Sequence, residues 1–294
     1  MINVDLCRRV NKMKHLKENL ILVAKGFVIG IANIIPGVSG GTLAITLGIY
    51  ERLIKAISHF FTNLKENIKF LVPIAVGAVL SLLILSNVIG YALDHYPIPT
   101  TLLFVGLIFG GVPLLYRHVK TEKKSGSNLL IFFITFAIVT IFAFLKEGNF
   151  SVDLSNLNLF GYILLFIVGM VAAATMVIPG ISGSFMLMLL GYYQPIINTI
   201  RNLTRFDDLT KSFMILIPFG IGVLVGIVLI AKLIEFLLEK YEVKTYFGIL
   251  GFVLASVLTL IYGLFGNSFD IVQILIGVVT FFIGSIVAYK LGDE

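Results

Sequence analysis

The sequence PGVSGGT at residues 36–42 recurs as PGISGSF at residues 179–185, and both copies stand between short apolar segments. The match continues without a gap and at a constant spacing, so that Leu47-Gly48 meets Leu190-Gly191 and Tyr50 meets Tyr193. After a loop that is slightly longer in the second copy, further positions agree: Pro73, Gly77 and Gly106 with Pro218, Gly222 and Gly251. Agreement over about a hundred positions indicates an internal duplication.

Composition limits the class of protein. Of the 294 residues, 58% are hydrophobic and 13% are charged, whereas a soluble domain carries about 25% charged residues. Such a chain cannot cover a globule of its own size with polar surface, which excludes a soluble enzyme, a disordered chain and a nucleic-acid-binding protein. The single cysteine, Cys7, excludes a disulfide framework and a cysteine metal cluster. The composition therefore predicts an all-α polytopic membrane protein with one integral domain over residues 1–294.

Ten apolar segments follow one another along the chain. They lie at residues 20–35, 38–50, 68–93, 98–116, 129–145, 159–178, 185–193, 213–238, 245–264 and 271–289. A helix needs about 20 residues to cross the bilayer core, and the segments 20–35, 38–50 and 185–193 are shorter than that. Because the short segments flank the two Pro-Gly-x-Ser-Gly motifs, each motif is expected to form a re-entrant or broken-helix hairpin, followed by spanning helices.

Basic residues predict the orientation of these segments. Lys and Arg are frequent in the N-terminal tail and at residues 52–69, 117–124 and 240–244, whereas the loops at 94–97 and 263–270 contain none. By the positive-inside rule, both termini are then expected in the cytoplasm, with segments 20–35 and 38–50 forming a hairpin that returns to the same side.

The predicted organisation is an inverted repeat. Repeat 1 covers residues 20–116 and repeat 2 covers residues 159–264. A connecting loop, a span and an external loop lie between them at 117–158, and a final span follows at 265–294. Three spans separate the two hairpins, and an odd number of crossings inverts the second copy, as is typical of secondary transporters.

One loop departs from the charge rule. The loop after segment 185–193 is predicted to be external, yet it contains Arg201, Arg205 and Lys211, partly offset by Asp207 and Asp208. Weak selection on charge late in the chain is one interpretation. The other is an external basic collar that attracts an anionic ligand.

The two motifs carry the chemistry of an anion site. Proline stops the incoming helix, glycine permits close approach of the backbone, and serine can cap the outgoing helix. Free backbone N–H groups at a helix N-terminus, with a hydroxyl beside them, bind phosphate or carboxylate. The predicted phosphate-binding residues are Gly37, Ser39, Gly40, Gly41 and Thr42 in the first motif, and Gly180, Ser182, Gly183 and Ser184 in the second. The alternative is tight helix packing by small residues.

Other polar residues near the motifs are candidates for auxiliary roles. Lys25 lies inside an apolar segment, where it either snorkels to the headgroups or points at the same anion. Asn33 precedes the first motif and offers an amide. Glu51 and Arg52 form a local salt bridge or helix cap, or Glu51 takes part in proton coupling. Arg201 and Arg205 complete this auxiliary set.

A catalytic interpretation of the first motif is rejected. Residues 37–41 fit the Gly-x-Ser-x-Gly pattern of serine hydrolases, but a serine nucleophile needs a base within hydrogen-bond reach. None of His15, His59, His95 and His118 lies inside a predicted span. The sequence therefore predicts no enzyme, no catalytic residue, no metal site and no cofactor.

The stretch 25–57 resembles a family of bacterial and archaeal membrane proteins that was long known only as a domain of unknown function. The resemblance rests on Gly30, Asn33, the motif at 36–42 and GIYE at 48–51, and it includes the second motif. It implies transport of polyprenyl phosphate, notably undecaprenyl phosphate, the lipid carrier of cell-wall synthesis, from the outer to the inner leaflet of the cytoplasmic membrane.

Each motif would form one half of the phosphate site, and alternating access to these two halves would accomplish such transport. The partners implied are polyprenyl phosphate, membrane lipids and a coupling ion, either proton or sodium, with no nucleic acid. The alternative function is a small-anion channel or an ion-coupled transporter of anionic solutes, because helix N-termini near the midplane also suit chloride or carboxylates.

Overall fold

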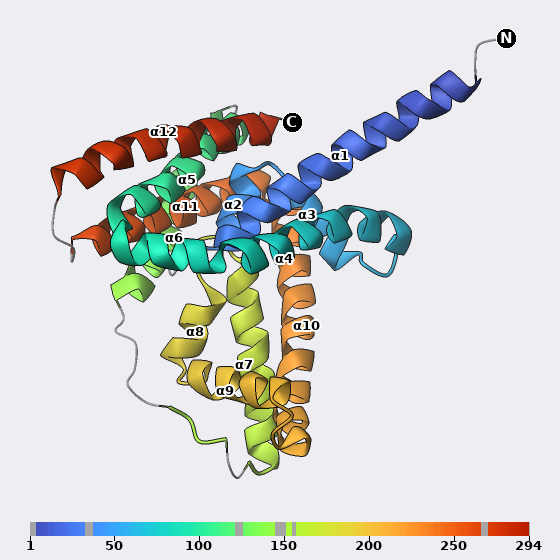
Figure 1. Ribbon diagram of the computed structural model, residues 1–294, viewed down its shortest axis with the longest axis vertical. Helices are drawn as coiled ribbons and strands as arrows, with labels where there is room; N and C mark the ends of the chain where they lie inside the picture. Colours follow the sequence, from blue (N-terminus) through green and yellow to red (C-terminus); the bar gives the residue numbers. More distant parts are fainter. Residues whose placement is uncertain are drawn as a thin grey trace. The chain divides into compact units, whose positions relative to one another are not determined.

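All regular secondary structure in the described part of the protein is helical. The computed structural model describes residues 4–32, 38–120, 126–144, 151–154, 157–265 and 270–293, and contains no strand within them. The helices shown in Figure 1 are α1 (Val4–Ala32), α2 (Gly40–Thr46), α3 (Tyr50–Ser58), α4 (Leu64–His95), α5 (Pro97–Lys120), α6 (Gly126–Phe144), α7 (Leu159–Val177), α8 (Gly183–Leu189), α9 (Tyr193–Thr204), α10 (Leu209–Lys240), α11 (Glu242–Leu264) and α12 (Ile271–Asp293). The predicted all-α class is confirmed.

Six of the described helices are long and apolar enough to cross a membrane: α4, α5, α7, α10, α11 and α12. They coincide with the longer predicted segments, and several extend beyond them into polar flanking residues. Helix α6 is a shorter apolar helix, with its apolar part at Gly126–Phe142. The membrane-spanning character that the composition predicts is thus carried by these helices.

Helix bounds recur along the chain with the spacing found in the sequence. Helices α2 and α8 begin at Gly40 and Gly183, which are matching positions of the two motifs, and both contain seven residues. Helices α4 and α10 begin at Leu64 and Leu209, with the same spacing as the matched prolines Pro73 and Pro218, and both contain 32 residues. The starts of α6 and α12 keep this second spacing.

Each short segment after a motif is broken once more than the apolar pattern predicts. Segment 38–50 contains α2 and then the start of α3, and segment 185–193 contains α8 and then the start of α9. The break falls at Gly48, with φ +69°, and at Gly191, with φ +76°. Left-handed backbone of this kind favours glycine, so the repeated Leu-Gly dipeptide ends each short helix.

The chain forms two compact units. Unit 1 comprises residues 1–35, 43–114 and 266–294, and unit 2 comprises residues 36–42 and 115–265. Helix α12 therefore belongs with α1, α3, α4 and most of α5, whereas α6 belongs with α7 to α11. The first motif, at 36–42, belongs to unit 2 with the second motif.

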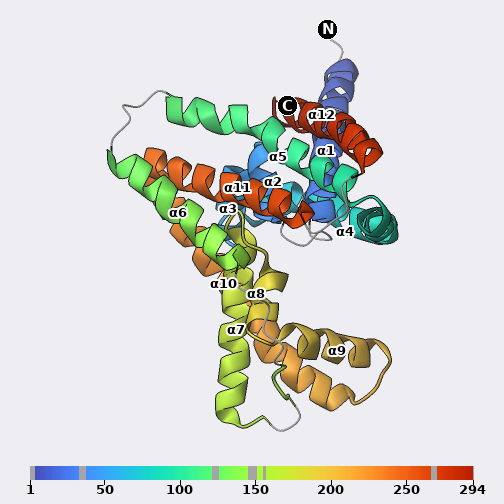
Figure 2. The same cartoon turned by 90° about the vertical axis from the view of Figure 1, so that its left-hand side faces the viewer.

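Glycines allow the long helices to pack closely in both units. In unit 1, Gly26 of α1 faces the Ile74 carbonyl of α4, and Gly77 of α4 faces the Val23 carbonyl of α1. In unit 2, the matching Gly169 of α7 and Gly222 of α10 face the carbonyls of Phe219 and Phe166. Figures 1 and 2 both show α7 and α10 side by side. Small residues at such contacts are the usual means of helix association in membranes.

Close contacts between a glycine and a backbone carbonyl also join α5 to α12 and α11 to α6. Gly106 of α5 faces the Phe281 carbonyl of α12 in unit 1, and Gly251 of α11 faces the Phe132 carbonyl of α6 in unit 2. Helix α6 follows α5 in the chain but packs on α11, and α12 follows α11 but packs on α5. The first half of the chain thus supplies α6 to unit 2, and the second half supplies α12 to unit 1.

Replacing Gly222 by alanine is expected to destabilise the protein, because the new Cβ collides with the Phe166 carbonyl, and overpacking of this kind costs about 1–3 kcal/mol. The matched control is Gly220→Ala on the same helix, where a Cβ meets nothing within 4 Å. Thermal denaturation in detergent should show a lower melting temperature for Gly222→Ala alone. Equal melting temperatures for the two variants would contradict the α7–α10 contact.

Candidate functional site

The two Pro-Gly-x-Ser-Gly motifs meet inside unit 2. The Thr42 Oγ1 accepts a hydrogen bond from the Gly180 N–H at 2.8 Å, and the Ser39 Oγ donates to the Ile178 carbonyl at 3.4 Å. Residues 138 and 139 positions apart in the sequence are therefore in direct contact. The convergence of both motifs at one place is the central feature of the site.

Two glycines make this contact close. A Cβ on Gly41 would lie 2.9 Å from the carbonyl oxygen of Val177, the last residue of α7. Gly180 has φ +84°, and a Cβ there would lie 2.8 Å from the Phe252 carbonyl oxygen. Any larger residue at either position would push the first motif away from the end of α7 or the second motif away from α11.

The hydroxyls of the first motif are buried. Ser39 is 3% exposed and Thr42 is fully buried, and each is bonded to the interrupted backbone of the second motif. Thr42 thereby satisfies an amide that no helix satisfies, which is a requirement for irregular backbone at membrane depth. In this conformation the packing interpretation accounts for the contacts of Ser39, Gly41 and Thr42.

The second motif presents its hydroxyls differently. Ser182 stands at the N-cap position of α8, but its side chain makes no capping hydrogen bond, so the predicted serine cap is not formed. Instead the Ser182 Oγ and the Ser184 Oγ lie 2.7 Å apart in a hydrogen bond at an exposed position. Gly183 is buried against Met176 and Ala172 of α7. Among the described hydroxyls of the two motifs, Ser39 and Thr42 are buried, whereas the Ser182–Ser184 pair is accessible.

Three of the predicted residues add little to this geometry. Gly37 and Asn33 lie outside the described residues. Gly40 is the first residue of α2 and is half-buried. The phosphate-binding role assigned to the two motifs stays a prediction.

Lys25 and Arg52 come together in unit 1, at a cavity that both side chains line. Lys25 is 4% exposed, and Arg52 lies in the first turn of α3 with its guanidinium 4.3 Å from the centre of the Phe70 ring. Glu51 precedes Arg52 and is half-buried. Sequence reasoning missed Glu18, Lys69 and Phe70 at this cavity, because the folded chain brings α1 and α4 together there.

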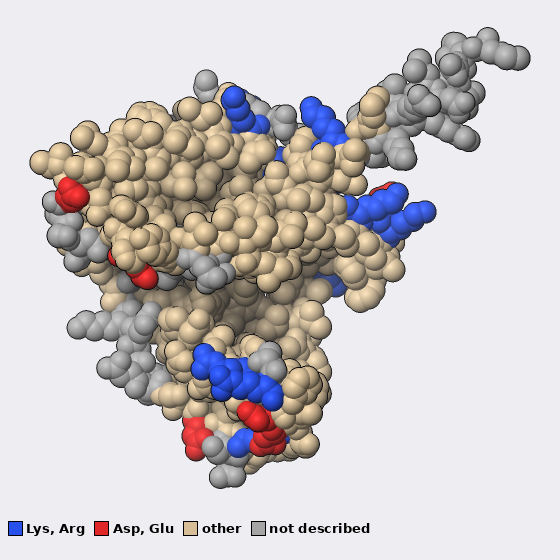
Figure 3. Space-filling view, in the orientation of Figure 1, with Lys and Arg blue, Asp and Glu red and all other residues tan. Residues whose placement is uncertain are grey.

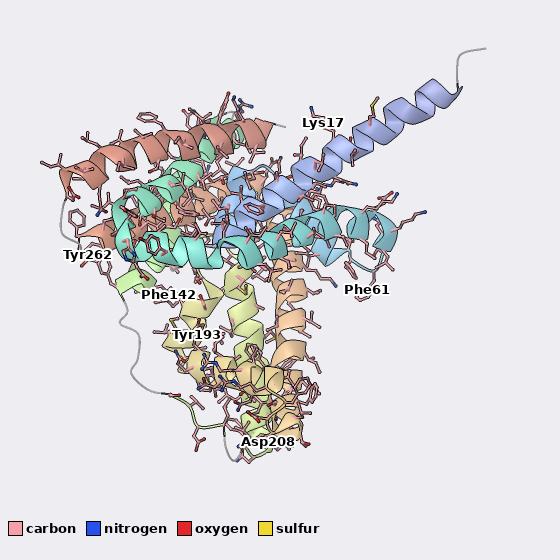
Figure 4. The ribbon with its side chains drawn as sticks, in the orientation of Figure 1. Lys17, Phe61, Phe142, Tyr193, Asp208 and Tyr262 are labelled. Carbon is pink, nitrogen blue, oxygen red and sulfur yellow. The ribbon has the colours of Figure 1, made fainter. Side chains whose placement is uncertain are left out.

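Arg201 and Arg205 are exposed at the C-terminal end of α9 in unit 2. Figure 3 shows acidic and basic side chains together over this end of the unit. Asp208, labelled in Figure 4, caps α10 by accepting a hydrogen bond from the Lys211 N–H. A cavity of about 440 Å³ between α9, α10 and residues 151–154 is lined by Asp153, Asp208 and Lys211, and by neither arginine.

The motif serines have partners other than histidine. The Ser39 hydroxyl bonds to a backbone carbonyl and the Ser182 hydroxyl to Ser184. Among the described residues, no group of three or more His, Cys, Asp and Glu side chains could hold a metal ion.

Comparisons with known proteins agree with one another. The family described as undecaprenyl phosphate translocase-like matches residues 29–264. The polyprenyl-phosphate transporter of Staphylococcus aureus is 35% identical over 279 residues, which are 92% of this chain and 95% of that protein. The polyprenyl-phosphate transporter of Vibrio cholerae is 31% identical over 247 residues, 79% of this chain and 74% of that protein. No solved structure matches the chain significantly.

A match across most of the chain, together with two curated relatives above 30% identity, is consistent with the paired motifs and the spanning helices. The chain belongs to the undecaprenyl phosphate translocase-like family of multi-pass membrane proteins.

Proposed function

We propose that this protein is a transporter, and not an enzyme, that carries polyprenyl phosphate across the cytoplasmic membrane from the outer to the inner leaflet. The names of its relatives support this substrate. The observation that carries the proposal is the meeting of the two motifs in unit 2, where Thr42 bonds to Gly180 and the Ser182–Ser184 hydroxyl pair is exposed.

The physical problem of such transport is confined to the headgroup. An isolated charge in hydrocarbon costs on the order of tens of kcal/mol, whereas a polyprenyl tail is as apolar as lipid. The protein therefore has to replace the water around the phosphate with hydrogen-bond donors. Hydroxyls and backbone amides at a helix break provide such donors, and they carry no permanent charge that would hold the phosphate too tightly to release it.

In the proposed cycle, the Thr42–Gly180 hydrogen bond opens as phosphate enters. The Gly180 amide and the hydroxyls of Ser182 and Ser184 then donate to the phosphate. Hydrogen bonds to phosphate thus replace the Thr42–Gly180 and Ser182–Ser184 bonds within the protein. The repeats are inverted and alternate in their access to the two leaflets. A proton or sodium ion drives the cycle, with Glu51 as the coupling carboxylate, and both termini face the cytoplasm.

Replacing Ser182 and Ser184 together by alanine is expected to slow headgroup movement at least tenfold, because the phosphate loses two donors. The assay reconstitutes the protein in liposomes with polyprenyl phosphate and measures which leaflet exposes the headgroup. Ser256→Ala is the matched control, since this buried serine bonds to the Val253 carbonyl on its own helix. No protein-dependent movement with wild type would overturn the proposal, and selective movement of chloride would favour an anion channel.

The contact between the motifs is tested by Thr42→Val. Loss of the Thr42 hydroxyl leaves the part-buried Gly180 amide without its acceptor. The cost is below the figure of about 1–3 kcal/mol that applies to a fully buried group. Thr46→Val is the control, because Thr46 is equally buried on α2 but bonds to the Leu43 carbonyl of the same helix. Thr42→Val should melt at a lower temperature than Thr46→Val. Identical behaviour would count against the proposed cycle.

The proposed orientation is tested with single cysteines in a Cys7→Ser background. Arg205→Cys, at the end of α9, is expected to react with a membrane-impermeant maleimide in intact cells, whereas Lys55→Cys, at the matching end of α3, should react only after lysis. Both positions are exposed in the protein. Labelling of both cysteines from the same side would show that the repeats are not inverted.

A further inference from the structure

Unit 1 contains a cavity of about 850 Å³ between α1, α3 and α4. Five charged side chains line it: Glu18, Lys25, Arg52, Glu66 and Lys69. The rest of its wall is largely apolar, from Ile21 and Leu22 of α1 to Val72 of α4. A cavity with a charged part and an apolar part suits an amphiphile.

The internal repeat provides a comparison for this cavity. At the matching place in unit 2, Leu165, Val168, Tyr192 and Ile215 form a hydrophobic core. The repeat alignment pairs these residues with Leu22, Lys25, Ile49 and Phe70, all of which line the cavity. In unit 2 the core is completed by Leu154, which is 8% exposed. The cavity beside α9 shares Leu154 and Ile215 with this core. The two units therefore differ less in being hollow than in the side chains at these positions, which are apolar in unit 2 and include Lys25 in unit 1.

The three basic residues of the cavity are specific to the first repeat. Lys25 aligns with Val168, Arg52 with Pro195, and Lys69 with Met214. Val168 is 4% exposed, as is Lys25, so an apolar residue satisfies the packing at this position. Placing a lysine there carries a desolvation cost that packing does not require, and a bound anion gives the lysine a function.

The geometry of Arg52 fits the same role. Its guanidinium lies 4.3 Å from the centre of the Phe70 ring, and a cation held over an aromatic face is oriented while keeping its N–H groups for a ligand. Guanidinium groups bind phosphate through two parallel hydrogen bonds. The unit 1 cavity has three basic and two acidic side chains in its wall. The unit 2 cavity beside α9 has two aspartates and one lysine, so acidic side chains are in excess there.

We propose that the unit 1 cavity is a second binding site, which takes a phosphate monoester attached to an apolar chain. Lys25 and Arg52 contact the phosphate, and the apolar wall formed by Ile21, Leu22 and Val72 contacts the first isoprene units. The assignment of the chain as polyprenyl rests on the proposed function, whereas the phosphate site rests on the cavity itself. It gives the headgroup a site on charged side chains, distinct from the uncharged donors of the two motifs.

The test uses geranylgeranyl monophosphate with a photoreactive diazirine near the phosphate, added to the purified full-length protein in detergent. Cross-linked peptides are identified by mass spectrometry. Wild type should be labelled in peptides that contain Leu22 or Phe70, and Lys25→Met and Arg52→Gln should reduce this labelling at least tenfold. Lys17→Met is the matched control, because Lys17 is an exposed lysine on α1 outside the cavity (Figure 4).

Competition identifies the source of the phosphate. If unlabelled geranylgeranyl monophosphate prevents labelling of the cavity peptides and the same concentration of inorganic phosphate does not, the result supports a lipid headgroup. Equal protection by inorganic phosphate shows a free-phosphate site and overturns the assignment of the apolar wall. A diazirine analogue of geranylgeraniol, which lacks phosphate, should label the cavity weakly in every variant.

Labelling of the cavity that does not change in folded Lys25→Met and Arg52→Gln, or its absence from the cavity peptides, would overturn the inference. Arg52 is exposed, so Arg52→Gln keeps the test valid if Lys25→Met fails to fold. Lysine-dependent labelling without lipid movement in liposomes would keep the cavity site and overturn the proposed function. Lipid movement without cavity labelling would keep the proposed function and overturn the cavity site.

Discussion

Interrupted helices in an apolar chain must find partners for their exposed backbone groups within the protein, and this requirement organises unit 2. The break after α7 leaves the Ile178 carbonyl and the Gly180 amide outside regular helix, and the first motif supplies Ser39 and Thr42 to bond them. Each of these hydrogen bonds spares the cost of leaving a backbone group unpaired within the protein. A polar cluster is thereby built where two distant parts of the sequence meet.

The rest of the architecture brings the two motifs together by close packing of long helices. Glycines at matching positions of both repeats let backbones touch, as Gly77 does against α1 and Gly222 does against α7. Without a hydrophobic driving force between helices in lipid, shape and close approach decide which helices pair. Duplicated glycines therefore impose the same pairings twice, while side chains that line cavities differ between the copies.

The helical class, the long spans and the breaks at the two motifs could be predicted from the sequence alone, because apolar runs and repeats can be read directly from it. It did not predict the breaks at Gly48 and Gly191, since the apolar pattern continues through them, although the repeated Leu-Gly pair was a usable signal. The hydrogen bond from Gly180 to Thr42 could not be predicted, because it depends on packing between residues 138 positions apart. The capping role expected of Ser182 is wrong, since its side chain makes no cap hydrogen bond and is bonded to Ser184 instead.

The exchange of the last helix of each half has a consequence for biosynthesis. When the ribosome has completed α1 to α5, the partner for α5 has not been made, because α12 is translated after α11. Helix α6 follows, and its partner α11 is made only after α7 to α10. The face of α5 that carries Gly106 and the face of α6 that carries Phe132 thus stay open to lipid or to insertion factors until the C-terminal third of the chain arrives. Neither half, expressed as a separate polypeptide, contains the helices needed to complete its own bundle, so assembly in the membrane is a property of the whole chain.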